Sequence, residues 1–231
     1  MASIFVAALA YVVVLAPVVI PYGLVLATAL LLIVVIALPA IASGLAVKTR
    51  SRLGDKAAKE GLEIPLVEAD CRHFSLDRLF ELIICPFSAM QHMHDRASLE
   101  AFLDRVRAHL TPGAPFIFDV FNPNVEVLAR GAGERFPVFT YTEEESGQEI
   151  FVEEATDYDD AAQVSHITWY CTGGGSDEVR EEEIHLRCFY PQELDMLLYY
   201  NRFEILVKLG TFSGEPFASG LGRQIVVCRP V

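Results

Sequence analysis

The sequence predicts an α/β fold, in which a mostly parallel sheet carries an antiparallel β insertion and follows a long hydrophobic segment. Residues 62–120 alternate short apolar runs with an amphipathic helix, which is the pattern of a parallel sheet with crossover helices. Residues 136–190 alternate apolar and polar residues with a period of two, which favours antiparallel strands that face water on one side. The first charged side chain is Lys48, so residues 1–47 form the hydrophobic segment.

Residues 1–47 have two interpretations, and the first is a transmembrane hairpin. A membrane span needs about 20 apolar residues, and the stretch before Lys48 is long enough for two. Pro17 and Pro21 lie near its middle, where a hairpin would turn, and the basic residues that begin at Lys48 mark a cytoplasmic flank. We therefore expect a membrane-associated protein with its remaining domain in the cytoplasm; a cytoplasmic protein without a span is the alternative.

The second interpretation is a degenerate first strand, helix and second strand of a Rossmann-like sheet. Residues 12–15 and Leu32–Ile36 are runs of Val, Leu and Ile, which are typical of buried parallel strands. The turn after the first run, residues 16–20, has no glycine that would let the backbone approach a ligand closely. Ala37 stands where such folds carry an acid for ribose hydroxyls. On this interpretation the segment completes the sheet but lacks the usual chemistry of a nucleotide site.

From Lys48 onward the predicted elements follow one another without a long linker. Residues 48–60 are a polar helix, and residues 96–110 are an amphipathic helix that ends at a Thr-Pro-Gly sequence. Buried strands are predicted where short apolar runs occur, at residues 62–67, 81–85 and 116–120. Strands and helices that alternate in this way form a parallel α/β sheet.

The second half of the chain begins with the insertion. Four strands with alternating polarity are predicted there, at residues 136–141, 149–154, 164–170 and 183–189. A helix then runs from Tyr190 to Tyr200, and the chain closes with strands at residues 203–208 and 224–228. We therefore predict a hydrophobic segment at residues 1–47 and one domain at residues 48–231, with an insertion at about 136–190 that covers the carboxyl edge of the sheet.

The net charge argues against a nucleic-acid partner, and the cysteine spacing argues against a zinc or redox site. The formal net charge is −13, and an acidic surface repels the phosphates of nucleic acids, so no nucleic-acid partner is expected. The five cysteines lack the Cys-x-x-Cys spacing of zinc sites and redox motifs. They indicate reduced, mostly buried thiols and no metal site.

Four stretches of the chain carry a family resemblance. They are Glu68-Ala69-Asp70, FELIICPFSAMQHM at residues 80–93, HLTPGAPFIFDVFNP at residues 109–123 and YPQELDMLL at residues 190–198. In this order and at this spacing they resemble class I S-adenosylmethionine-dependent methyltransferases. The resemblance implies a Rossmann-like methyltransferase sheet and transfer of a methyl group from S-adenosylmethionine to O, N or C of a small-molecule acceptor. It also places residues 16–20 on the family's glycine-rich cofactor loop and Ala37 on its ribose-binding acid, and this sequence has neither motif.

Four residues are candidates for binding the cofactor. By resemblance, Asp70 takes the position of the family's adenine-contacting acid, and Cys71 stands beside it. Cys85 and Phe87 follow the fourth strand, at the carboxyl edge where open α/β sheets bind ligands. The alternative for Asp70 is a strand-end cap, and the alternative for the others is ordinary turn and core packing.

His92 is the candidate general base. A histidine near a methyl donor can take a proton from a hydroxyl or amine acceptor, and a capping or surface role is the alternative. The candidates for the acceptor pocket are polar or aromatic side chains near the ends of predicted strands: Ser88, Gln91, Asp119, Asn122, Asn124 and Tyr141. Turn formation and sheet packing are the alternatives for these residues.

Two functions remain open at this point. The first is an active methyltransferase with a small-molecule acceptor as its partner. The second is a catalytically inactive, membrane-anchored structural or assembly subunit of a membrane protein complex. It is favoured by the missing loop and acid, because leaving one buried hydrogen-bond partner unsatisfied costs about 1–3 kcal/mol.

Overall fold

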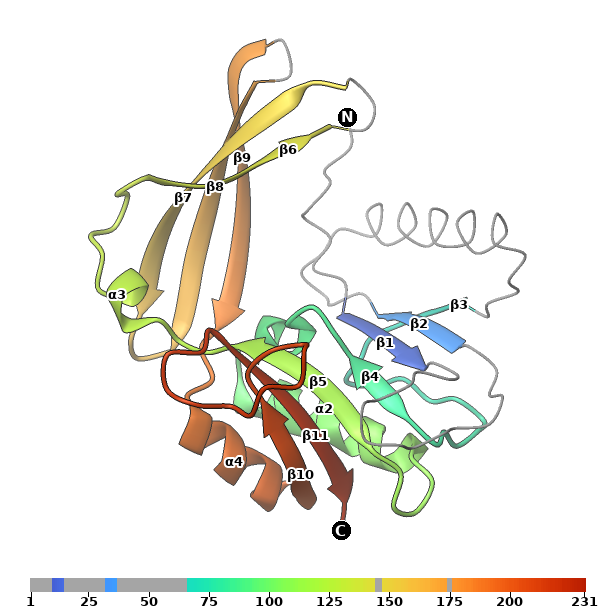
Figure 1. The fold of residues 1–231 in the computed structure, drawn as a ribbon. Helices are drawn as coiled ribbons and strands as arrows, with labels where there is room; N and C mark the ends of the chain where they lie inside the picture. Colours follow the sequence, from blue (N-terminus) through green and yellow to red (C-terminus); the bar gives the residue numbers. More distant parts are fainter. Residues whose placement is uncertain (1–9, 15–31, 37–65, 144–146, 174–175) are drawn as a thin grey trace. The chain divides into compact units, whose positions relative to one another are not determined.

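The computed structural model describes residues 10–14, 32–36, 66–143, 147–173 and 176–231 (Figure 1). The chain forms two compact units. The first, here called the α/β unit, comprises Leu9–Asn122 and Phe189–Val231. The second, here called the antiparallel unit, comprises Pro123–Cys188.

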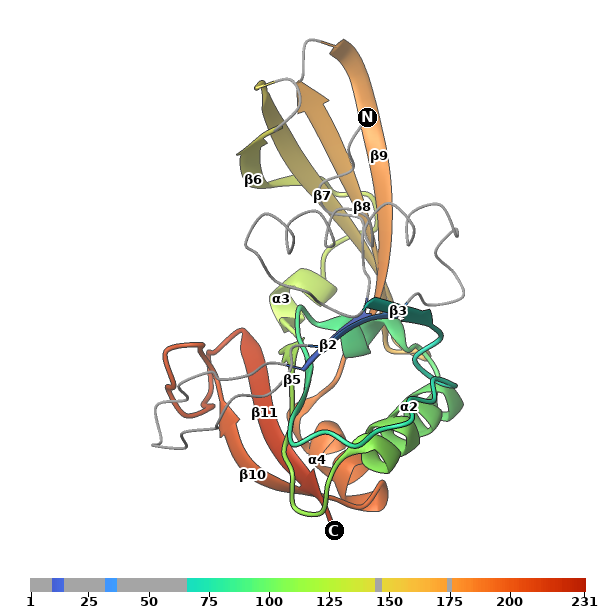
Figure 2. The same ribbon diagram turned by 90° about the vertical axis from the view of Figure 1, so that its right-hand side faces the viewer.

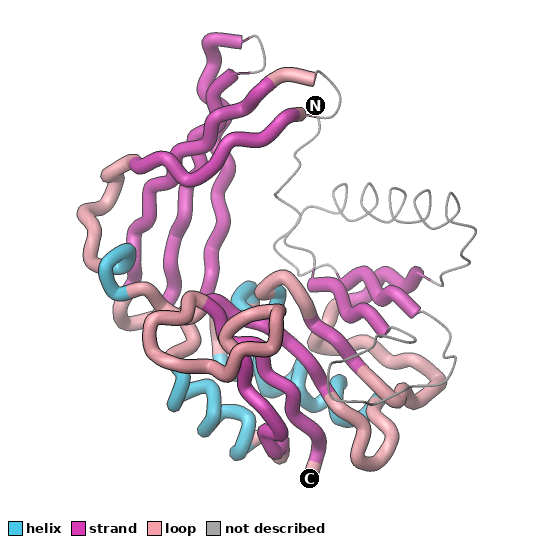
Figure 3. Tube along the Cα trace, in the orientation of Figure 1, coloured by secondary structure: helices cyan, strands magenta, loops and turns pink. Residues whose placement is uncertain are grey.

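A seven-stranded sheet is the frame of the α/β unit (Figure 3). In chain order its strands are β1 (Ala10–Val14), β2 (Leu32–Ile36), β3 (Leu66–Ala69), β4 (Ile83–Cys85), β5 (Phe116–Phe121), β10 (Phe203–Leu209) and β11 (Arg223–Pro230). In space the order is β10-β11-β5-β4-β1-β2-β3. The strand order therefore reverses between β1 and β4, which is the point where open α/β sheets bind their ligands.

Strand β1 differs from the prediction in its direction. β2 is parallel to β3 and β4 is parallel to β5, as predicted for a parallel core. β1, however, is antiparallel to both of its neighbours, β2 and β4. A run of Val and Ala residues pairs well in either direction, so its sequence carries no signal for the direction of the strand.

The prediction of membrane association is wrong. Ala10–Val14 and Leu32–Ile36, which lie in the proposed hairpin, are strands of the sheet and pair with β4 and β3 respectively. Within the described residues, no helix is both long and apolar enough to cross a membrane. The alternative function as a subunit of a membrane complex depended on that anchor and loses its basis. The candidate loop at residues 16–20, Ala37 and the predicted helix at residues 48–60 lie outside the described residues, so the boundary at residue 47 stays a prediction.

Two helices cover one face of this sheet (Figure 2). Helix α2 (Arg96–His109) begins at Asp95, whose carboxylate accepts a hydrogen bond from the Ser98 amide at 2.8 Å and so caps the first turn. It ends before the predicted Pro-Gly stop. Helix α4 (Pro191–Tyr200) begins with a proline. Amides in the first turn of a helix have no intrahelical acceptor, so the lack of an amide hydrogen in proline costs no hydrogen bond there.

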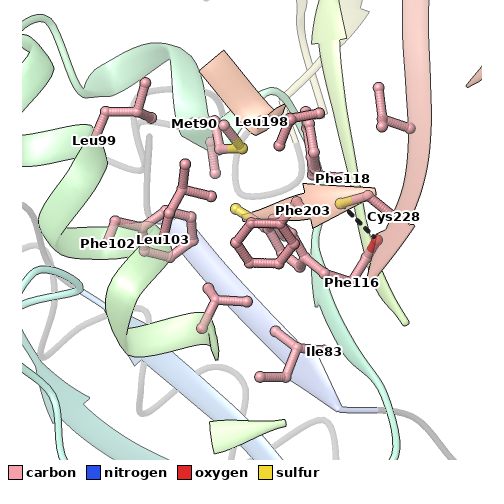
Figure 4. Close-up of a cluster of buried hydrophobic side chains, with 14 of the residues drawn as sticks. Ile83, Met90, Leu99, Phe102, Leu103, Phe116, Phe118, Leu198, Phe203 and Cys228 are labelled. Atoms are coloured by element: carbon pink, nitrogen blue, oxygen red, sulfur yellow. Dashed lines mark hydrogen bonds between the residues drawn. The ribbon is translucent and has the colours of Figure 1, made fainter. Parts of the chain in front are cut away.

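The core lies between these helices and the sheet (Figure 4). Alternate residues of β5, Phe116, Phe118 and Val120, point to the helix face and are buried. The ring of Phe116 lies 5.1–6.0 Å from three other rings. Asp119 and Phe121 therefore lie on the opposite face of β5, away from α2 and α4.

The antiparallel unit contains helix α3 (Val125–Leu128) and a four-stranded sheet. Its strands are β6 (Phe136–Thr142), β7 (Glu149–Asp159), β8 (Val164–Gly173) and β9 (Ser176–Arg187), each antiparallel to the next. The predicted antiparallel sheet is thus present, with β9 starting earlier than expected. Ile150, Val152 and Cys171 form a small core with three aromatic side chains on one of its faces. That this sheet covers the carboxyl edge of the α/β unit stays a prediction.

Candidate functional site

The candidate site lies at the carboxyl edge of the parallel strands. β4 ends at Cys85 and β5 ends at Phe121. β11 begins at the same edge, because Arg223 pairs with Phe121. The turn that follows β4 is therefore next to the reversal of strand order, and the end of β5 and the start of β11 lie beside it.

The turn after β4 has an uncommon backbone. Phe87 and Ser88 follow one another in the left-handed region, with φ of 59° and 57°. Residues other than glycine reach this region at a cost of about 1–3 kcal/mol each. The Phe87 side chain is 81% exposed, whereas Ser88 is buried. The short helix η1 (Ala89–His92) follows this turn directly.

Asp119 connects this turn to β5 and β11. Its buried carboxylate accepts hydrogen bonds from the Ser88 amide at 3.2 Å and the Ser88 hydroxyl at 3.3 Å. It also forms an ion pair with Arg223, whose guanidinium in turn donates to the Ser88 hydroxyl at 3.3 Å. A carboxylate that is buried to this degree needs such partners, because an unpaired charge in a protein interior is strongly destabilising.

Arg223 is also flanked by aromatic rings. Its guanidinium carbon lies 4.3 Å from the ring centre of Phe121 and 5.4 Å from that of Phe212. Phe121 is 46% exposed and Phe212 is 76% exposed. The edge thus presents a fixed cation with apolar surface on two sides.

Four of the residues predicted for the acceptor pocket, Asp119 among them, meet at this edge. Ser88 bonds Asp119, as described, and the Gln91 side-chain oxygen accepts from the Phe121 amide at 2.8 Å. The Asn122 side chain donates to the Leu221 carbonyl at 3.1 Å and fixes the segment that leads into β11. Sequence reasoning missed Arg223, since the predicted strand began one residue later and a single arginine at a strand end gives no signal.

His92, the predicted general base, is the last residue of η1 and is half-buried. It stands directly after Gln91, whose side chain is tied to the end of β5. The assignment of a catalytic role to His92 stays a prediction.

Tyr141 and Asn124 belong to the antiparallel unit. The Tyr141 hydroxyl accepts a hydrogen bond from Arg180 at 2.8 Å, and burial raises the pKa of its phenol. The Asn124 side chain caps helix α3 by accepting from the Glu126 amide at 3.0 Å. A role for Tyr141 in the acceptor pocket therefore stays a prediction, and Asn124 has a local structural role.

Asp70, the predicted adenine-contacting acid, follows β3 and is held by Arg72. The guanidinium of Arg72 donates to both carboxylate oxygens, with the shortest bond at 2.6 Å, and the Arg72 amide donates a further bond at 2.8 Å. These side-chain hydrogen bonds hold the pKa of Asp70 below its usual range. A carboxylate has about four acceptor positions, so Asp70 has little capacity left for a ligand while Arg72 stays in place.

Cys71 and Cys85 are fully buried core residues beside the site. Burial raises the pKa of the Cys71 thiol to about 12 and that of Cys85 well above its usual value. Both thiols are therefore protonated at neutral pH and contribute apolar surface, not nucleophiles. Within the described parts of the chain, no group of three or more His, Cys, Asp or Glu side chains is placed to hold a metal ion.

The raised thiol pKa predicts a loss of stability in alkali. Between the ordinary value of 9.0 and about 12, Cys71 keeps its proton in the folded protein and loses it in the unfolded chain. The unfolded state then binds fewer protons, so the free energy of unfolding falls as the pH rises. Urea unfolding at about pH 8 and about pH 10 measures this fall, and Cys71→Ala is expected to reduce it. An equal fall in both proteins would contradict the assignment.

The comparisons with known proteins give one match by sequence. No protein-family model matches the chain. Over 56 residues the chain is 38% identical to the dTDP-3-amino-3,6-dideoxy-α-D-glucopyranose N,N-dimethyltransferase of Streptomyces fradiae. This match covers 24% of the chain and 22% of that enzyme, which is about a fifth of the enzyme's length.

Several solved structures have a similar fold. An S-adenosylmethionine-dependent methyltransferase from Clostridium acetobutylicum superposes with a TM-score of 0.65 at 20% identity, covering 85% of this chain and 74% of that one. CcbJ, a methyltransferase from Streptomyces caelestis, gives a TM-score of 0.66 at 20% identity, covering 78% and 70%. CalS10, an amino pentose methyltransferase from Micromonospora echinaspora, gives 0.60 at 18% identity, covering 86% and 73%. The chain thus has the fold of S-adenosylmethionine-dependent methyltransferases, and the resemblance predicted from its sequence is confirmed.

Proposed function

We propose that this chain uses S-adenosylmethionine to methylate the amino group of a sugar or a sugar-like small molecule. The observation that carries the proposal is the 38% identity with an N,N-dimethyltransferase named for an amino-sugar substrate. Proteins of similar fold include the amino pentose methyltransferase CalS10 and the sugar N-methyltransferase KedS8. The sequence match covers only 24% of the chain. The proposal therefore also needs support from the side chains at the carboxyl edge of the α/β unit.

The turn after β4 suits a sulfonium compound. When bound, S-adenosylmethionine supplies a methyl group that leaves a positively charged sulfur for the acceptor nitrogen. An aromatic face attracts such a cation by about 0.5–2 kcal/mol, and the exposed ring of Phe87 is available at this turn. The neutral thiols of Cys71 and Cys85 belong to the buried core of the same unit and contribute apolar packing.

Other residues fit the donor less well and predict weak binding. The oxygens of Asp70 are occupied by Arg72. The sequence at residues 16–20 has no glycine, and Ala37 replaces an acid. Losing one such hydrogen-bond partner costs about 1–3 kcal/mol, so we expect the donor to bind less tightly than in proteins that have the motifs.

The proposed role of His92 concerns the proton of the acceptor. An amino group is largely an ammonium ion at neutral pH, and its nitrogen has no lone pair for attack until one proton leaves. A ring nitrogen of His92 accepts this proton, so that the neutral amine is the nucleophile. The polar side chains of Ser88 and Gln91 precede His92, but both are committed to β5, so they position the turn and η1 rather than move a proton.

A methylation assay tests this function. The full-length protein is incubated with S-adenosylmethionine and a dTDP-linked 3-amino-3,6-dideoxy sugar, and mass spectrometry detects added methyl groups. The control acceptor has a hydroxyl in place of the amine. We expect methylation of the amino sugar alone; methylation of the hydroxyl control, or of neither compound at saturating donor, would contradict an amino-sugar acceptor.

A further inference from the structure

We infer that Asp119 is a positioning residue of the methyl-transfer site, which acts by holding the Phe87–Ser88 turn in its left-handed conformation. This inference rests on the proposed function for its purpose, and on the geometry of the α/β unit for its mechanism. Asp119 itself is buried and does not need to contact a ligand to exert this effect.

The turn after β4 would not be stable on local grounds. Among the described residues, four non-glycine residues have positive φ: Phe87, Ser88, Gln163 and Arg202. Gln163 and Arg202 occur singly, in a hairpin turn and after a helix, where polar residues tolerate the left-handed region. Phe87 and Ser88 are consecutive, and a bulky aromatic residue in this region is a genuine outlier. Interactions from elsewhere in the fold must therefore hold the pair in place.

Asp119 supplies those interactions. Its carboxylate accepts hydrogen bonds from the amide and the hydroxyl of Ser88, and it forms an ion pair with Arg223. Arg223 donates to the same hydroxyl from the other side. The hydroxyl of Ser88 is thus fixed between the carboxylate of Asp119 on β5 and the guanidinium of Arg223 on β11.

The cost of this turn is best explained by what it exposes. At position 87 a glycine would adopt the same φ without strain. A buried side chain would offset the strain through its packing contacts. Phe87 does neither, since its ring is 81% exposed at the carboxyl edge. Strained backbone that presents an apolar ring to solvent is typical of functional sites, where the strain fixes the geometry before a ligand arrives. We therefore assign Asp119 the task of presenting Phe87 to the donor.

The first test needs no activity. In Asp119→Asn the Ser88 amide loses its charged acceptor, so hydrogen exchange of residues 87–91 in the ligand-free protein should accelerate by about 5- to 150-fold. The Kd for S-adenosylhomocysteine, used as a stable probe, should rise by a similar factor in calorimetric titration. The double variant Asp119→Asn with Arg223→Gln leaves no unpaired buried charge and repeats the test if the single variant fails to fold.

Rescue by glycine separates positioning from general stability. Adding Ser88→Gly to Asp119→Asn removes the penalty for positive φ, and the affinity should recover about two- to fivefold. Adding Ser88→Ala instead keeps the penalty and should restore nothing. His109→Gln is the matched control, because His109 is a buried polar residue of the same unit that bonds the Leu76 amide at 2.9 Å, outside the candidate site. It should lower the melting temperature without changing the affinity.

Unchanged exchange in Asp119→Asn, absence of rescue by glycine, or an equal loss of affinity in His109→Gln would each overturn the inference. A wild-type protein that does not bind S-adenosylhomocysteine would instead count against the proposed function. The hydrogen exchange of residues 87–91 would still show in that case whether Asp119 holds the turn.

Discussion

Replacing His92 with alanine is expected to lower kcat for an amine acceptor by about 10²–10⁴-fold, the contribution of a positioned general base. The reason is that the acceptor nitrogen must lose a proton before it can attack, and His92 is the titratable side chain that follows the β4 turn within η1. The free energy of unfolding should change by no more than about 1 kcal/mol, because His92 is only half-buried. Turnover at saturating donor and urea unfolding measure the two quantities.

His94→Ala is the matched control for this variant. His94 lies two residues further along, is exposed and stands outside η1, so its replacement should leave turnover unchanged. Added imidazole should restore part of the turnover of His92→Ala, since a free base can enter the space of the missing ring. Full activity of His92→Ala would remove His92 from the mechanism, and equal losses in both variants would indicate a structural effect.

Phe116→Ala is expected to lower the free energy of unfolding by about 3–5 kcal/mol, the cost of replacing a fully buried phenylalanine. Phe116 is completely buried, and its ring lies 6.0 Å from Phe102, 5.1 Å from Phe118 and 6.0 Å from Phe203. It therefore links β5 to both α2 and β10, and its loss leaves a cavity that neighbouring aromatic rings cannot fill. Urea unfolding followed by circular dichroism measures this change.

Leu79→Ala is the control for the core variant, because Leu79 is 53% exposed and should change stability by only about 0.5 kcal/mol. A loss below about 1 kcal/mol in Phe116→Ala would contradict the position of this ring at the centre of the core.

Local patterns in the sequence predicted most of the α/β unit. The 3.6-residue spacing of Leu99, Phe102 and Leu103 predicted α2, and the apolar runs after residue 80 predicted β4 and β5. The same kind of pattern failed for the hydrophobic segment, since hydropathy does not distinguish a membrane span from strands buried in a sheet. It also could not give the direction of β1, because direction depends on connections and not on the residues of the strand.

The sequence predicted the positions of site residues only where these residues directly follow a predicted strand. Ser88, Gln91 and Asn122 were expected at the carboxyl edge, because each lies just beyond an apolar run, and the structure brings them together there. The pairing of Asp119 with Arg223 was not predictable, since the two residues are 104 positions apart and meet through the antiparallel pairing of β5 with β11. Tyr141 was grouped with them by residue type, and it belongs to the other unit.

Calorimetric titration of the full-length protein with S-adenosylmethionine tests the central claim most directly. A micromolar ligand has about 8.2 kcal/mol of binding free energy, and losing about 1–3 kcal/mol of it gives a Kd between about 5 and 150 μM. We predict saturable binding of one donor per chain in this range, weakened by Asp119→Asn. Absence of saturable binding up to millimolar donor, which corresponds to less than about 4 kcal/mol, would contradict the claim that this edge is a methyl-transfer site.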